Sequence, residues 1–171
     1  MKIMYLIYKI FKKISSFIHT NINKKIVTKY WKNLKINFKS YLWKNTFVWN
    51  NCHFNGINIS WWWKVIIWDN FHSWKECQII TQNHNYDNWT EIPYDNTYIY
   101  KDIEVWDNVW MWNNVIVIPW IKISEWAIIW VWSVVTKDVP YCAIVGWNPA
   151  KIIKHRDKEH YEKLKKDKKF H

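Results

Sequence analysis

The most regular part of the chain is the stretch 105–140, in which hydrophobic side chains recur every six residues. Written in sixes, it reads VWDNVW, MWNNVI, VIPWIK, ISEWAI, IWVWSV and VTKDVP. The first place of each six is apolar, and the fifth place is apolar or small. An α-helix repeats apolar residues every three to four positions and a strand every two, so neither explains this period. A sustained period of six is typical of a β-helix whose first and fifth side chains point inward.

Sixes of the same kind occur upstream, from about residue 47, and they resume at residue 67 after an irregular step. The regularity lapses over residues 82–102, which are polar, aromatic and rich in turn residues. A long insertion in a regular solenoid is more often functional than accidental. We therefore predict an all-β solenoid, a parallel β-helix over residues 41–154, with an excursion loop at 82–102.

The two ends of the chain have a different pattern. Residues 1–20 place apolar side chains at helical spacing with lysines between them, too many for a membrane span. This basic amphipathic helix could lie on an anionic membrane surface, or it could pack on the solenoid or on a neighbouring subunit. We expect residues 1–40 to form a basic N-terminal segment. Residues 155–171 are expected to form a charged, solvated tail that is helical or frayed.

The composition contains 17 tryptophans and only 2 glycines. The tryptophans hold the corner places of the sixes, which usually require the conformational freedom of glycine. Those at second places are Trp106, Trp112 and Trp130, and those at fourth places are Trp120, Trp126 and Trp132. Some bacterial genetic codes read UGA as glycine and others as tryptophan. Our hypothesis is that most of these residues are glycine in the living protein, whereas Trp110, at a sixth place, is genuine.

The net charge of +11 predicts an anionic partner. Nucleic acid is not expected, because the aromatic residues follow the register of the coils and not a binding face. Cys52 and Cys77 hold inward fifth places, which indicates buried thiols in a reducing cytoplasm. His53 and His72 hold outward sixth places, and their spacing to His84 argues against a three-histidine metal site. No metal is expected.

His84 lies in the excursion loop, within Thr81-Gln82-Asn83-His84-Asn85-Tyr86-Asp87. Histidine can act as a general base near neutral pH, because its ordinary pKa is about 6.5. A base on a loop held by a rigid stack of coils could meet a substrate between subunits. The alternative is a loop histidine that only hydrogen-bonds locally.

Taken together, these motifs resemble the hexapeptide-repeat acyltransferases, which include maltose and galactoside O-acetyltransferases and polysaccharide O-acetyltransferases. The resemblance covers about residues 45–154. It rests on the sixes, on the segment DNVWM at 107–111, on SVVTKDVP at 133–140 and on AIVGWNPAK at 143–151. With Trp147 read as glycine, the last segment is the closing signature of the family. The departure is Asn85, where the sugar acetyltransferases have proline.

The resemblance implies a left-handed β-helix and a homotrimer with active sites between subunits. It implies acetyl-CoA as co-substrate and His84 as the catalytic base. The residues that match the family's coenzyme A groove are Asn113, Val131, Thr136, Lys137 and Lys151. The residues assigned to the acceptor are Asn55, Asn83, Asn85, Tyr86 and Trp110.

The function implied is acetyl-CoA-dependent O-acetylation of a hydroxyl on a sugar or a cell-surface polysaccharide precursor. The first alternative is N-acylation of an amino sugar, and the second is a non-catalytic solenoid scaffold. We expect a cytoplasmic protein, with peripheral membrane contact through residues 1–20 at the inner membrane surface.

Overall fold

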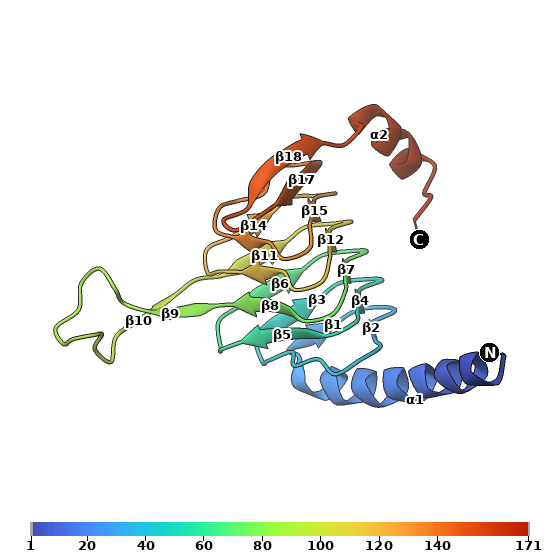
Figure 1. Ribbon diagram of the computed structural model, residues 1–171, viewed down its shortest axis with the longest axis horizontal. Coiled ribbons are helices and arrows are strands. Elements are labelled where there is room, and N and C mark those ends of the chain that lie inside the picture. The colour runs from blue at the N-terminus through green and yellow to red at the C-terminus, as the bar shows by residue number, and fades with distance from the viewer. Residues whose placement is uncertain (1, 171) are drawn as a thin grey trace.

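The inward places of the sixes form the core of a parallel β-solenoid, as the period predicts (Figure 1). The computed structural model describes residues 2–170. The first-place side chains are at most 1% exposed: Val105, Met111, Val117, Ile123, Ile129 and Val135. The fifth places are buried as well: Val109, Val115, Ile121, Ala127, Ser133 and Val139. Because each coil packs only on its neighbours, a local repeat is sufficient to build this core.

Three parallel sheets form the walls of the solenoid. The first contains β1 (Lys29–Tyr30), β3 (Thr46–Val48), β6 (Val65–Ile67), β11 (Ile103–Val105) and β14 (Lys122–Ile123). The second contains β2 (Lys35–Ile36), β4 (His53–Phe54), β7 (His72–Ser73), β12 (Trp110–Met111), β15 (Ile128–Ile129) and β17 (Ala143–Gly146), with β18 (Lys151–His155) antiparallel at its edge. The third contains β5 (Ile57–Ser60), β8 (Cys77–Ile80), β13 (Ile116–Val117) and β16 (Val134–Val135). The predicted left-handed β-helix is confirmed.

The remaining elements extend from this prism. A hairpin of β9 (Gln82–His84) and β10 (Tyr98–Tyr100) projects from one side, where the excursion loop was expected (Figure 1). Helix α1 (Lys2–Ile26) lies along the first coils, and helix α2 (Lys158–Lys166) follows β18. The first coil begins inside the segment 1–40, because β1 pairs with β3 and β2 pairs with β4. Over residues 2–170, neither helix combines the length and apolar character needed to cross a bilayer.

The fourth place of the sixes, Asp138 excepted, turns a corner with positive φ. Asparagine holds this place in several coils, with φ between 56° and 61° at Asn51, Asn70, Asn108 and Asn114. Asparagine tolerates the left-handed region better than other residues with a side chain, glycine excepted. The side chains also bond from coil to coil, since Asn51 Nδ2 donates to Asn70 Oδ1 (3.1 Å) and Asn70 Nδ2 to Asn108 Oδ1 (2.9 Å). These corners are therefore built around a residue that accepts positive φ.

Tryptophan occupies the same fourth place in the later coils. Trp120, Trp126 and Trp132 have φ of 78°, 60° and 60°, and Trp147 in the closing turn has 86°. For a bulky side chain this region is a genuine outlier. The second-place tryptophans of the described chain are not in this region; they stack in ladders, such as Trp112 on Trp130 at 5.0 Å between ring centroids. The requirement for glycine-like φ thus falls on the fourth places and not on the second.

Candidate functional site

His84 ends strand β9, on the hairpin that projects from the solenoid. Tyr98 is its partner across the antiparallel pair. The strand is anchored by Thr81, a buried residue whose Oγ1 donates to the Ser60 carbonyl oxygen of the adjacent coil (2.9 Å). The hairpin therefore starts at a residue fixed in the solenoid wall, and His84 lies three residues further out along β9.

Two tyrosines enclose the His84 ring. The ring of Tyr94 stacks on it at 3.8 Å between centroids, and the ring of Tyr98 lies at 4.5 Å. The Nδ1 atom of His84 is buried and has no hydrogen-bond partner among residues 2–170. A buried polar atom without a partner is rare and needs a reason. The local hydrogen bond considered as the alternative role is absent at this atom.

The carboxylate of Asp95 organises the loop beyond His84. Asp95 Oδ2 accepts from the backbone N–H of Thr90 (2.9 Å), and Oδ1 accepts from the backbone N–H of Thr97 (2.8 Å). The hydroxyls of both threonines donate to the same carboxylate. These bonds, above all those from Thr97, hold the pKa of Asp95 below its ordinary value. The loop that supplies Tyr94 is thus closed by one ionised side chain.

Replacing Asp95 with asparagine is expected to loosen this loop. At neutral pH the amides of Thr90 and Thr97 should exchange with deuterium faster in D95N than in the wild type. In the wild type, the depressed pKa keeps the bonds intact above the ordinary Asp pKa of about 4. Protection should be lost only as the pH falls through the lower pKa of the folded state. Hydrogen exchange measures this, with Asp87→Asn on the same loop as the control; equal exchange in D95N would contradict the assignment.

The predicted acceptor residues beside His84 have different surroundings. Asn83 is exposed on β9 and Tyr86 is 53% exposed in the loop. Asn85 instead closes a local turn, because its Nδ2 donates to the Asn88 carbonyl oxygen (2.9 Å) and its Oδ1 accepts from Asn88 N–H (3.2 Å). The side chains of Asn83 and Tyr86 are therefore exposed, while Asn85 shapes the loop.

Three of the five residues assigned to coenzyme A line one cavity. Thr136, Lys137 and Lys151 surround a space of about 360 Å³ at the C-terminal end of the solenoid. The two lysines are exposed, and both lie within reach of an anion in that space. Asn113 and Val131 are not part of this lining; they share the third place of adjacent coils, where Asn113 Oδ1 accepts from Lys75 N–H (3.2 Å).

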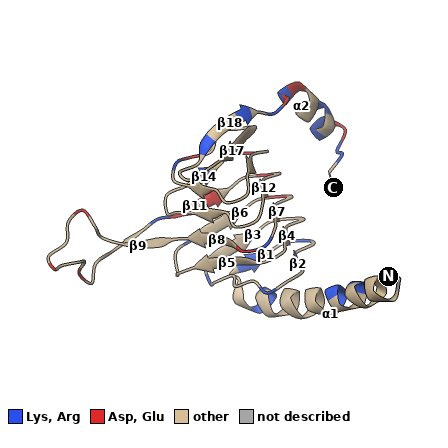
Figure 2. Ribbon diagram, viewed as in Figure 1, with Lys and Arg blue, Asp and Glu red and all other residues tan. Residues whose placement is uncertain are grey.

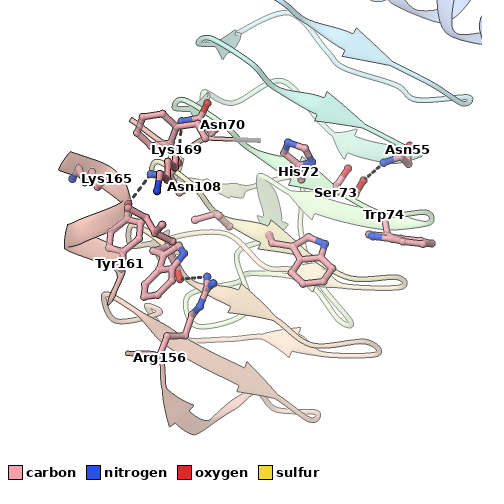
Figure 3. Close-up of a pocket in the computed structure, with 15 residues that line it drawn as sticks. Asn55, Asn70, His72, Ser73, Trp74, Asn108, Arg156, Tyr161, Lys165 and Lys169 are labelled. Carbon is pink, nitrogen blue, oxygen red and sulfur yellow. Dashed lines mark hydrogen bonds between the residues drawn. The ribbon is translucent and has the colours of Figure 1, made fainter. Parts of the chain in front are cut away.

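A second cavity, of about 390 Å³, is lined by Asn55 and Trp110, two of the predicted acceptor residues. Figure 3 shows this cavity, with Asn55 labelled. It lies between the outer face of the second sheet and helix α2, and His72 also lines it. The side chain of Asn55 is held by a bond from Nδ2 to the Ser73 carbonyl oxygen (2.7 Å). His84 is not among its lining residues, and its hairpin projects from the other side of the solenoid (Figure 1).

The C-terminal residues that cover this cavity were missed in the sequence. The Arg156 guanidinium lies 3.5 Å from the Trp126 ring centroid, and the Tyr161 ring stacks on the same indole at 4.0 Å. Lys165 Nζ lies 2.7 Å from Glu125 Oε1. Burial, with the hydrogen bond to Glu125, raises the pKa of Tyr161. The tail was expected to be solvated throughout, but the buried Tyr161 docks it on the solenoid. A single aromatic residue among many charged ones gives no pattern in the sequence that predicts this contact.

Cys52 and Cys77 lie in the core, and His53 and His72 lie on the second sheet. Burial raises the pKa of the Cys52 thiol to about 12 and that of Cys77 to about 11, so neither supplies a thiolate. Their predicted burial is confirmed. The rings of His53 and His72 pair on adjacent coils, 4.7 Å apart, and both are half-buried. Among residues 2–170 no three His, Cys, Asp or Glu side chains form a group suited to a metal ion.

The parallel prism, the projecting hairpin and the closing turn define the fold of the hexapeptide-repeat acyltransferases, and the predicted resemblance is confirmed at the level of fold. No protein-family model matches the sequence. A chloramphenicol acetyltransferase of Klebsiella aerogenes is 50% identical over 50 residues, which are 29% of this chain and 24% of that protein. The chain thus matches about a quarter of the length of this curated relative.

Solved structures share the fold over most of the chain. The N-acyltransferase AntD of Bacillus cereus, in complex with dTDP and 3-hydroxybutyryl-CoA, has a TM-score of 0.72 at 14% identity, over 86% of this chain and 81% of its own. A galactoside acetyltransferase in complex with coenzyme A has a TM-score of 0.60 at 18% identity, over 82% of this chain and 71% of its own. A maltose O-acetyltransferase from Clostridium difficile has a TM-score of 0.54 at 24% identity, over 81% of this chain and 74% of its own. At these identities the similarities establish the fold.

Proposed function

We propose that this protein is an acetyl-CoA-dependent O-acetyltransferase that acts on a hydroxyl of a sugar or a polysaccharide precursor. The observation that carries the proposal is the imidazole of His84, presented on a hairpin of a left-handed β-helix with its Nδ1 buried and unpartnered. The similar proteins named above that are crystallised with coenzyme A or an acyl-CoA support the choice of co-substrate. The O-acetyltransferases among them support a sugar hydroxyl as acceptor.

His84 is the general base in this proposal. Its imidazole removes the proton from the acceptor hydroxyl while the oxygen attacks the thioester carbonyl. A C–O bond forms, the C–S bond breaks, and the coenzyme A thiolate leaves and takes up a proton. Packing against Tyr94 and Tyr98 fixes the plane of the base before the substrate arrives. The oxyanion of the intermediate requires a donor, for which a backbone N–H of the groove is suited.

The cavity of Thr136, Lys137 and Lys151 fits the phosphate groups of coenzyme A. A double variant, Lys137→Gln with Lys151→Gln, is expected to raise the Kd for coenzyme A by about tenfold, because two cationic partners of the phosphates are lost. Titration calorimetry measures this Kd. Lys154→Gln, exposed on the same strand β18 but outside the cavity lining, is the matched control. An unchanged Kd in the double variant would remove these lysines from the site.

We propose a homotrimer as the active form. His84 and the cavity of Asn55 and Trp110 lie on different sides of one solenoid, so a site that uses both groups requires a second copy. A neighbouring subunit could also supply the partner of His84 Nδ1. We place the enzyme in the cytoplasm, at the inner membrane surface, which suits a lipid-linked precursor as acceptor.

The acceptor class is tested with purified protein and labelled acetyl-CoA. Free sugars, nucleotide sugars and glycan extracts are offered in parallel with their amino-sugar counterparts. Label on a sugar hydroxyl, in an alkali-labile ester, is the expected result. Transfer only to an amine would favour the N-acyltransferase alternative, to which the high TM-score with AntD points. Absence of transfer to every acceptor, together with no binding of coenzyme A, would favour a non-catalytic scaffold.

A further inference from the structure

Helix α1 turns its polar side toward the solenoid and its apolar side away from it. Thr20 Oγ1 accepts from the backbone N–H of Ile36 (2.9 Å), and Asn23 Oδ1 accepts from the N–H of Leu42 (3.1 Å). Asn23 is fully buried, and Ser15 on the same side also donates to the first coil. These bonds satisfy edge groups of the first coil that would otherwise lack partners. The contact with the solenoid therefore needs none of the helix's large apolar side chains.

The apolar side chains form a continuous exposed row on the opposite side. Their spacing of three and four residues places them on one helix face. They are 46–75% exposed: Ile3, Leu6, Ile7, Ile10, Phe11, Ile14, Phe17 and Ile18. At 1.5 Å of rise per residue, the row is about 24 Å long. An exposed apolar surface of this extent marks an interaction site.

The charges of the same helix identify its partner. The helix contains six lysines and no acidic residue, and Figure 2 shows its charged residues as basic only. Between α1 and the first coils lies a cavity of about 770 Å³, lined by Lys9, Lys12, Lys13, Lys24 and Lys35. A second copy of α1 would bring lysines against lysines with no carboxylate to offset them. An anionic surface with an apolar interior matches both the row and the lysines.

We propose that α1 docks the protein on the surface of an anionic lipid bilayer. The apolar row enters the boundary between headgroups and acyl chains, and the lysines contact the lipid phosphates. The long lysine side chains can reach the headgroup layer from the side of the helix. The solenoid would then stand on the membrane with its first coil nearest the lipid. Helix α1 contains no tryptophan, so this docking is the same whether the corner residues are tryptophan or glycine.

The test is sedimentation of the full chain with phosphatidylcholine vesicles that contain or lack phosphatidylglycerol. Binding is expected with the anionic vesicles and should be about tenfold weaker or more without the anionic lipid. The double variant Ile7→Glu with Ile14→Glu should weaken anionic-vesicle binding about tenfold or more. Ile92→Glu is the matched control, since Ile92 is 93% exposed on the excursion loop. Lys9→Gln with Lys13→Gln should reduce the preference for phosphatidylglycerol.

Thermal melting checks that each variant is folded. Its melting temperature should be close to that of the wild type, because the changed side chains are exposed. Failure of the wild type to bind anionic vesicles would overturn the proposal, as would equal binding by the Ile7 and Ile14 double variant. If that variant instead changes the molar mass in solution and the wild type binds no vesicles, a second copy covers the row. Acetyl transfer to a water-soluble acceptor should be the same in all variants. A failure of docking is therefore distinguishable from a failure of the proposed acyl transfer.

Discussion

His84→Ala is expected to lower kcat/KM for acetyl transfer by about 10²–10⁴-fold, the usual contribution of a general base. The Kd for coenzyme A should stay near the wild-type value, because His84 does not line the cavity that holds Thr136, Lys137 and Lys151. The loss should fall mainly on kcat, since the base acts on the acceptor proton in the transition state. Steady-state kinetics with labelled acetyl-CoA and calorimetry with coenzyme A measure the two quantities.

Two controls separate catalysis from folding of the hairpin. His84→Gln keeps a polar side chain between Tyr94 and Tyr98 but supplies no base, so it should lose activity as His84→Ala does. His160→Ala removes an exposed histidine from α2 and should leave kcat/KM unchanged. Transfer at the wild-type rate in both His84 variants would remove the residue from its proposed role.

The solenoid could be predicted from the sequence because its contacts repeat locally. Each six contributes one inward first and one inward fifth side chain, and the register between coils follows from the period itself. Strands β1 and β2 were not foreseen. Each has only two residues, Lys29–Tyr30 and Lys35–Ile36, and no six surrounds them. They form because strands β3 and β4 of the next coil offer backbone partners, and no hydrophobic pattern in their own residues predicts them.

The candidate site was only partly visible in the sequence. A histidine in a polar insertion could be read directly, but its enclosure by Tyr94 and Tyr98 depends on how the loop folds back, which no local spacing reveals. Docking of the tail depends on Tyr161 meeting Trp126, residues 35 positions apart in a charged and an apolar segment. Long-range pairs of this kind carry no periodic signal.

Replacing Trp120 and Trp132 with glycine is expected to stabilise the fold, by about 1–2 kcal/mol at each site. Both residues hold fourth places with φ of 78° and 60°, where a side chain strains the backbone and glycine does not. Trp132 is 70% exposed, so its removal forfeits little packing. The two sites lie in neighbouring coils, and their effects should nearly add if the side chains do not touch. Equilibrium unfolding in urea measures the gain as an increase in midpoint with little change in slope.

Three comparisons show whether backbone conformation is the cause. Trp132→Asn should recover part of the gain, because asparagine holds this place at φ 56–61° in four other sixes. Trp132→Ala should recover less, since alanine keeps the Cβ that opposes positive φ. Trp110→Gly should destabilise the protein, because this residue is half-buried in strand β12 and has no positive φ. Trp126 is left in place, since its ring packs on Arg156 and Tyr161.

The stability of these corners also bears on whether their tryptophan codons are translated as glycine in the host. If the fourth-place tryptophans are encoded by UGA in a code that reads it as glycine, the protein from its own host should contain glycine there, and intact-mass and peptide analysis would detect it. UGG codons at positions 120, 126 and 132, with no gain in stability from Trp120→Gly and Trp132→Gly, would overturn the hypothesis. Tryptophan would then be the native residue, and these corners would carry no backbone strain that glycine relieves.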